Sequence, residues 1–124
     1  VLFLVLISAC GPDNPFDPSP SGVAITVLLT GPSTARVRWN ASPDDDFYSY
    51  TLYRSQVGDI KNNPGSATVL GVFYDRYDKE YYDENLSAGT WYYALKVTNE
   101  GGFSTWSNEA GVTVGAEAIR KFDK

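Results

Sequence analysis

The stretch Ala35-Arg36-Val37-Arg38-Trp39-Asn40 has the clearest alternation of apolar and polar side chains in this sequence. Successive side chains of a β-strand point to opposite faces, so Ala35, Val37 and Trp39 would share one face. The two arginines and the asparagine would share the other. The stretch therefore predicts a β-strand that packs one side against a core and turns the other side to solvent.

Runs of the same kind recur along the chain, and clusters of Gly, Pro, Asn and Asp separate nearly all of them. Frequent Val, Thr and Tyr favour strands over helices. The predicted strands cover residues 23–29, 35–40, 48–55, 67–74, 81–83, 90–99 and 107–114. Seven strands with turns between them and no helix predict an all-β fold, an antiparallel sandwich of two sheets.

Composition removes several classes of function. The 124 residues are enough for one domain with appendages. The formal net charge of -5, without any basic cluster, argues against a nucleic-acid partner, because phosphate binding needs Lys and Arg gathered on one face. With no histidine and one cysteine, these residues cannot supply a zinc finger, a cysteine–histidine nucleophilic pair or an internal disulfide.

The first nine residues are apolar apart from Ser8. Such a run is too short to span a bilayer but has the length of a signal-peptide core. Because no initiating Met and no basic leader precede it, we expect residues 1–9 to be a signal peptide truncated at its N-terminus. The alternative is a short buried strand that carries Cys10 into a core.

The stretch Leu6-Ile7-Ser8-Ala9-Cys10 resembles the lipobox of bacterial lipoproteins. The resemblance implies that the Cys10 thiol receives a diacylglycerol, that the peptide is cut before Cys10, and that the new amino terminus is acylated. Two or more acyl chains give stable membrane attachment. The expected location is the bacterial cell envelope. The outer membrane is favoured because Gly11 follows the cysteine, where some lipoproteins retained in the inner membrane carry Asp.

Residues 11–21, GPDNPFDPSPS, contain four prolines. Proline lacks an N–H and fixes its own backbone angle, so this piece predicts an extended spacer of about 30 Å. The expected organisation is a signal peptide at 1–9, a lipidated cysteine and Pro-rich tether at 10–21, a domain at 22–114, and a tail or the start of a linker at 115–124.

Residues 22–114 resemble a fibronectin type III domain. The landmarks are Trp39, the Tyr50-Thr51-Leu52-Tyr53-Arg54 strand, the Leu86-Ser87-Ala88-Gly89-Thr90 approach to Trp91-Tyr92-Tyr93, and the segment 104–108. The resemblance implies an immunoglobulin-like sandwich with Trp39 in the core and a tyrosine near the start of strand six that folds its hydroxyl back onto the preceding corner. Trp106 departs from the family, which often has Pro there.

Two arguments disagree about the corner tyrosine. Counting from Leu86 selects Tyr92, whereas alternation places Trp91 and Tyr93 on the core face together with the apolar residues at 95 and 97. Both could hold only with a bulge near Tyr92. We favour the alternation, because the other assignment would turn the charged Lys96 inward.

Acidic residues offer two candidates for chemistry, and neither is specific. Asp44-Asp45-Asp46 could hold calcium through its oxygens, but it matches no EF-hand loop, and a solvated turn is favoured. Further acids, which could form a glycosidase pair, are Asp75, Asp78, Glu80, Asp83 and Glu84. A sandwich this small has no room for the deep pocket that catalysis needs, so we expect no enzyme, no metal and no cofactor.

Aromatic residues without an assured place in the core are the candidate binding surface. The selected residues are Tyr53, Tyr74, Phe103 and Trp106, with Tyr77 and Tyr92 as further members. Exposed rings can hold a protein or stack on a sugar, whereas cross-strand packing on an outer sheet face is the simpler interpretation. Two functions remain: a non-enzymatic membrane-anchored lipoprotein displaying the sandwich as spacer or protein-interaction module, and a carbohydrate-binding accessory module.

Overall fold

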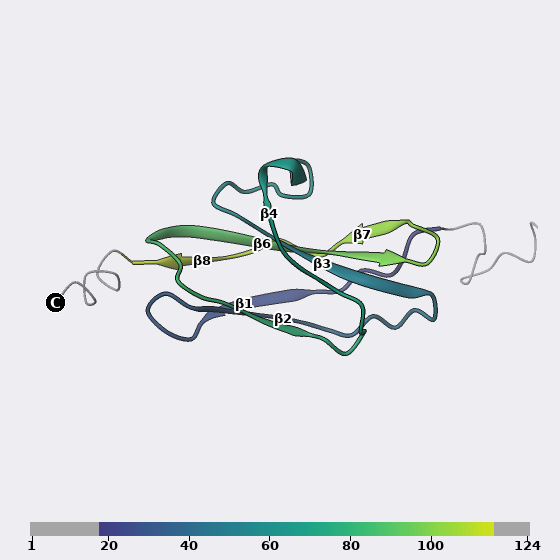
Figure 1. Ribbon diagram of the computed structural model, residues 1–124. Helices are drawn as coiled ribbons and strands as arrows, with labels where there is room; N and C mark the ends of the chain where they lie inside the picture. Colours follow the sequence, from purple (N-terminus) through teal and green to yellow (C-terminus); the bar gives the residue numbers. More distant parts are fainter. Residues whose placement is uncertain (1–17, 116–124) are drawn as a thin grey trace, which may run out of the picture.

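The computed structural model describes residues 18–115, and Figure 1 shows them as two β-sheets stacked face to face. The predicted signal peptide, the lipidated Cys10, the first part of the tether and residues 116–124 lie outside the described residues. Within the described part, no helix has the length and apolar character needed to cross a membrane.

The smaller sheet has the order β1-β2-β5, and the larger has the order β4-β3-β6-β7, with β8 also pairing with β6. All pairings are antiparallel. The strands are β1 (Ile25–Leu29), β2 (Ala35–Trp39), β3 (Phe47–Ser55), β4 (Thr68–Phe73), β5 (Glu80–Asp83), β6 (Gly89–Asn99), β7 (Ser104–Trp106) and β8 (Ala110–Val114), with a 3-10 helix η1 at Pro64–Ser66. The predicted all-β, two-sheet antiparallel sandwich is confirmed.

The last predicted strand, 107–114, differs from the structure, because the chain pairs with β6 in two segments, β7 and β8. Asn108 lies in the break between them. Its side chain accepts a hydrogen bond from the N–H of Ile25 at 2.9 Å and donates to the carbonyl of Ile25 at 3.0 Å. The edge strand is interrupted where this amide reaches across to β1 of the other sheet.

The core lies between the sheets and follows the alternation read from the sequence. Ala35, Val37 and Trp39 of β2 are all buried, as are Tyr50 and Leu52 of β3. Burying these side chains removes apolar surface from water, at about 25 cal/mol per Å². This burial stabilises the contact between the two sheets.

Strand β6 resolves the question of the corner tyrosine. Tyr93, Leu95 and Val97 are fully buried, and no register shift occurs near Tyr92, so the core face predicted from alternation is confirmed. The indole N–H of Trp91 donates to the carbonyl of Ser87 at 2.9 Å. Trp91 therefore makes the backward contact to the corner that the resemblance assigns to a tyrosine.

Candidate interaction surface

The edges of the two sheets differ in how they are protected. An edge strand presents unpaired backbone groups that can pair with another chain. At the edge of β1, the Asn108 side chain forms hydrogen bonds with both the N–H and the carbonyl of Ile25. Strand β5 has only four residues, and Glu80 at its start is an exposed charged side chain.

Residues 18–22 lie along β7 and cover its edge. The Thr105 hydroxyl donates to the carbonyl of Pro20 at 2.7 Å, and the Asn99 amide donates to the carbonyl of Pro18 at 2.6 Å. The end of the predicted Pro-rich tether is therefore held against the sandwich. Strand β8 pairs with β6 and also lies close to β1 of the smaller sheet.

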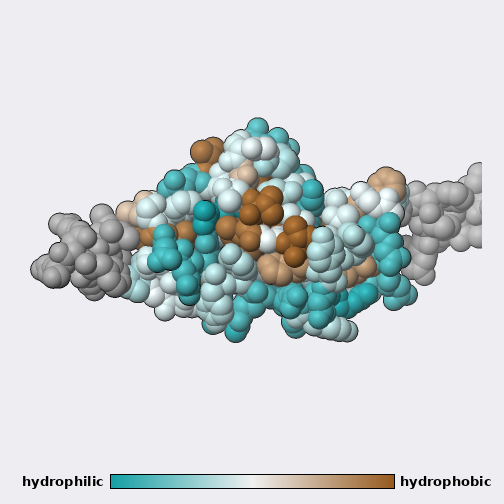
Figure 2. Space-filling view, viewed as in Figure 1, coloured by the Kyte–Doolittle hydropathy of each residue, from teal (hydrophilic) through white to brown (hydrophobic). Residues whose placement is uncertain are grey.

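Among the residues that the structure describes, no strand pairs with the outer edge of β4, and β4 itself contains no charged residue. It pairs on one side with β3, and among residues 18–115 no hydrogen bond reaches its other edge. Val69 and Val72 are 50% and 43% exposed. Figure 2 shows hydrophobic side chains gathered over β4 in the middle of the face turned to the viewer. This strand is the candidate interaction surface.

A bulge determines which side chains of β4 face outward. Gly71 pairs with Leu52 and Val69 with Tyr53, which leaves Leu70 as an extra residue. Leu70 packs against the core, and the two valines on either side of the bulge point to the outer face of the larger sheet. Without the extra residue, two side chains three positions apart would point to opposite faces.

Tyr53 and Trp106 pack against each other on the outer face of the larger sheet. Their ring centroids are 4.9 Å apart, and the Lys96 ammonium lies 5.6 and 5.7 Å from the two rings. Tyr53 is only 8% exposed. Its selection as an exposed binding residue is wrong, because cross-strand packing and the loop before β4 cover it.

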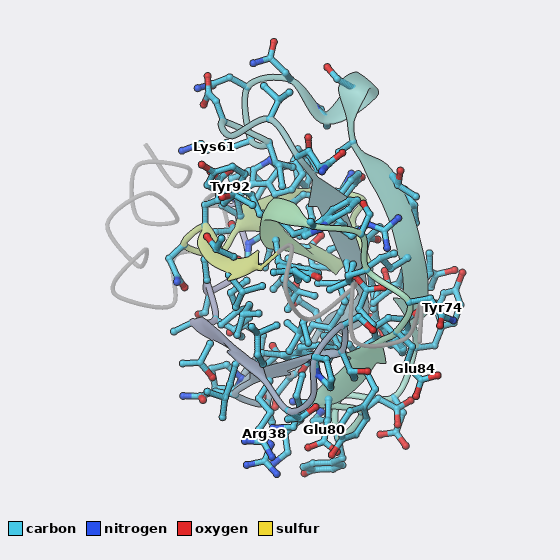
Figure 3. All side chains as sticks on the ribbon, turned by 90° about the vertical axis from the view of Figure 1, so that its left-hand side faces the viewer. Arg38, Lys61, Tyr74, Glu80, Glu84 and Tyr92 are labelled. Carbon is cyan, nitrogen blue, oxygen red and sulfur yellow. The ribbon has the colours of Figure 1, made fainter. Side chains whose placement is uncertain are left out.

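The other selected aromatics lie elsewhere. Tyr74 is exposed beside Tyr48, with ring centroids 5.5 Å apart in an edge-to-face contact. Phe103 is half exposed in the turn between β6 and β7, and Tyr77 is exposed. Figure 3 shows Tyr74 and Tyr92 on opposite sides of the domain. The selected residues therefore do not form a single aromatic surface.

The loop between β3 and β4 covers part of the outer face, which the sequence prediction did not include. Ile60 is 1% exposed and packs with Tyr53 and Ala94. The Glu109 carboxylate accepts hydrogen bonds from the N–H groups of Asp59 at 3.1 Å and Ile60 at 2.8 Å. The sequence signal for this contact was weak, because Ile60 is one of two large apolar residues in an otherwise polar loop and the other, Val57, is exposed.

Two of the acidic candidates accept hydrogen bonds from backbone N–H groups. Asp44 accepts a hydrogen bond from the N–H of Ser21 at 2.6 Å, and Asp75 accepts one from the N–H of Tyr77 at 2.9 Å. Asp78 and Glu84 are exposed. Between residues 18 and 115, no group of three or more acidic, His or Cys side chains could hold a metal ion.

Glu80 lines a shallow depression on the surface of the smaller sheet. The other lining residues are Arg38, Trp39, Tyr77 and Lys79. Glu80 accepts a hydrogen bond from Arg38 at 2.7 Å, and both side chains extend outward (Figure 3). The depression is lined by one carboxylate, whereas glycoside hydrolysis uses two.

Asp83 is buried and belongs to a network between the sheets. It accepts hydrogen bonds from Arg54 and, at 2.7 Å, from the Tyr93 hydroxyl. Burial raises the pKa of Tyr93, and the hydrogen bond to Asp83 raises this pKa further. These contacts explain how a charged residue is accommodated inside the sandwich.

Tyr50 makes a second buried contact through its hydroxyl. The hydroxyl accepts a hydrogen bond from the N–H of Ser42 at 2.7 Å and donates to the carbonyl of Arg76 at 2.8 Å. Burial is the main cause that raises the pKa of Tyr50. The hydroxyl thereby joins the loop before β3 to the loop after β4.

Comparisons with known proteins support the fold. No family model and no curated protein sequence matches the chain. The sixth fibronectin type III domain from human fibronectin type III domain containing protein 3 is 18% identical at a TM-score of 0.59, covering 78% of this chain and 84% of that chain. An Fn3-like protein from Clostridium thermocellum is 26% identical at a TM-score of 0.52, covering 74% and 86%. The domain has a fibronectin type III-like fold.

A bacterial enzyme contains a similar structure. Pectate lyase Pel3 from Pectobacterium carotovorum matches at a TM-score of 0.63 and 12% identity, over 75% of this chain. This chain spans only 27% of the length of that enzyme. At this identity the likeness concerns the fold alone, and the same sandwich hosts many functions.

Proposed function

We propose that this chain is a non-enzymatic lipoprotein of the bacterial cell envelope that displays its fibronectin type III-like sandwich as a spacer and protein-interaction module. Cys10 carries the lipid in this proposal, and the outer membrane is the favoured location because Gly11 follows it. The role needs no cofactor. The lipobox-like stretch before Cys10 supports the attachment, and the two ends of the domain support the spacer role.

The observation that carries the spacer role is that Pro18 and Val114 lie at opposite ends of the domain. The Pro18 carbonyl is bound by Asn99, the last residue of β6, whereas Val114 pairs with Gly89, the first residue. Strand β6 has 11 residues. At about 3.3 Å per residue, the two ends of the domain lie roughly 35 Å apart. Figure 1 shows the chain entering one end of the sandwich and leaving at the other.

The entry segment is attached to the domain at several points. Asp44 binds the N–H of Ser21, and Thr105 binds the carbonyl of Pro20. Residues 11–17 would connect this docked segment to Cys10, and seven extended residues reach at most about 25 Å. A force applied through the lipid anchor would therefore act on several strands and not on β1 alone.

The carbohydrate-binding alternative receives less support from the aromatic contacts. Stacking on a sugar needs exposed ring faces, but Tyr53 is covered and Lys96 lies against both Tyr53 and Trp106. Tyr48 and Tyr74 meet at an interplanar angle of 80°, so they do not form a flat platform. Specific binding of the purified parent chain on a glycan array would restore this alternative.

Metabolic labelling tests the lipid attachment. Cells producing the protein would be fed an alkyne-tagged palmitate, and the captured protein would be examined for label. The unchanged protein should be labelled and enter the detergent phase, while Cys10→Ser should lose the label. Ser8→Ala is the matched control, because it keeps a small residue before the cysteine and should retain the label. Unlabelled parent protein, or equal labelling of Cys10→Ser, would reject the attachment.

A further inference from the structure

We propose that the free edge of β4 binds β4 of a second copy of this chain, with the strands antiparallel and Val69 of one copy opposite Val72 of the other. The inference names a partner for the interaction role proposed above and rests on that role. The resulting dimer would have a continuous sheet across a two-fold axis, because the same edge is used by both copies.

The first argument is the lack of protection at this edge. Natural sheets guard free edges with charged residues, proline or a covering segment. Residues 66–74 contain no charged residue and no proline. The bulge at Leu70 is the protective feature that β4 retains, and it leaves both valines exposed.

The second argument is that β4 is self-complementary. In the proposed register, Val69 faces Val72, Leu70 faces Gly71, and Thr68 faces Phe73. The two valines lie on the outer face, whereas the other four residues pair with core-side neighbours or pack against the core. The order of core-facing and outward-facing side chains along β4 is therefore the same when the strand is followed from either end. In an antiparallel pair of two β4 strands, each side chain would lie opposite one on the same face of the sheet. This symmetry depends on the bulge.

The third argument concerns charge. Strand β4 itself contains no charged residue, Asp75 and Arg76 lie beyond its end, and Gly65 and Ser66 before it belong to the 3-10 helix η1. Like charges directly opposite each other would destabilise an antiparallel pair, and none meet here. The net charge of -5 on each copy repels at longer range, so added salt should strengthen the association.

The size of the contact sets its expected strength. Strand β4 has six residues, and its edge buries much less than the roughly 1,200 Å² found in stable interfaces. The dimer should therefore be weak in solution and depend on concentration. A lipid anchor would favour it by holding the copies in one membrane plane.

Cross-linking tests the register. The whole chain with Cys10→Ser, in a non-ionic detergent, would carry either Val69→Cys or Val72→Cys. Under mild oxidation, a mixture of the two proteins should form disulfide dimers several times more efficiently than either protein alone. Equal yields in the mixture and in the separate samples, or no dimer, would overturn the proposed register.

Sedimentation velocity from about 10 μM to about 1 mM tests the edge itself. Val72→Lys should weaken self-association at least about tenfold, because the dimer would desolvate the new charge. Val57→Lys is the matched control, because Val57 is 72% exposed in the loop after β3, and it should associate like the parent. Circular dichroism confirms folding of each variant. A monomeric parent, or equal association of Val72→Lys, would reject the β4 dimer without affecting lipid labelling at Cys10.

Discussion

Arg54 on β3 joins the two sheets by donating from one guanidinium nitrogen to both carboxylate oxygens of Asp83 on β5, at 2.8 and 3.1 Å. The side chain of Asp83 is 5% exposed, and that of Arg54 is 23% exposed. The guanidinium carbon lies 4.8 Å from the centroid of the Trp91 ring. The pair and the Tyr93 hydroxyl therefore connect the sheets through polar contacts within the sandwich.

Asp83→Asn should lower the free energy of unfolding by about 3 kcal/mol, because it removes the charge that compensates the partly buried Arg54. Denaturant unfolding at neutral pH measures the loss. Glu80→Gln is the matched control, since it breaks the exposed pair with Arg38 and should cost less than about 1 kcal/mol. Equal losses in the two variants would show that the Arg54–Asp83 pair has no special role.

Stability should fall as the pH rises above about 10. The pKa values of Tyr50 and Tyr93 are raised in the folded protein, chiefly by burial, so the unfolded chain releases these protons first. The contribution of these two tyrosines to the free energy of unfolding is fully present below about pH 10 and is lost as the pH rises above it. Thermal unfolding from about pH 8 to about pH 11 measures this decline. Tyr93→Phe should show a shallower decline than the parent, and the exposed control Tyr77→Phe should not.

Ile60→Ala should cost about 3 kcal/mol, because it creates a cavity beneath the loop before β4. Val57→Ala in the same loop should change the free energy of unfolding by less than about 0.5 kcal/mol, since that side chain is exposed. Denaturant unfolding compares them. A loss for Ile60→Ala as small as that for Val57→Ala would contradict the assignment of Ile60 to a structural cluster.

Thr105→Val should expose the end of the tether, because it removes the hydrogen bond to the Pro20 carbonyl while keeping the side-chain shape. Limited proteolysis of the whole chain should then cut residues 11–22 several times faster. Thr113→Val, which removes the hydrogen bond between Thr90 and Thr113, is the matched control and should leave this rate unchanged. An unchanged rate in both variants would mean that the Thr105 contact does not hold the segment.

Side-chain alternation was sufficient to predict much of the fold. Buried side chains recur at every second position of a strand that packs one face against a core. Trp39 and Tyr93 could therefore be assigned to the core without knowledge of the residues that they contact. The bulge at Leu70 could not be predicted in this way, because it depends on register against β3. Likewise, β4 is an edge strand because of the order of strands in the larger sheet, and side-chain alternation within a strand gives no information about that order.

The candidate site was predicted only in part for a related reason. Tyr53 was selected because it faces away from the core, but Ile60 reaches it from a loop whose path depends on tertiary contacts. Asp83 was one acid among several. Its importance became visible only with Arg54, which is 29 positions away and belongs to the opposite sheet.

Mass spectrometry of the mature amino terminus, on protein isolated from the cells that produce it, tests the central proposal most directly. The lipoprotein proposal predicts that the chain begins at Cys10, with a diacylglycerol on its sulfur and an acyl group on its amine. A mature chain that retains residues 1–9, or a Cys10 with an unmodified thiol, would contradict the proposal that this sandwich is displayed from a membrane.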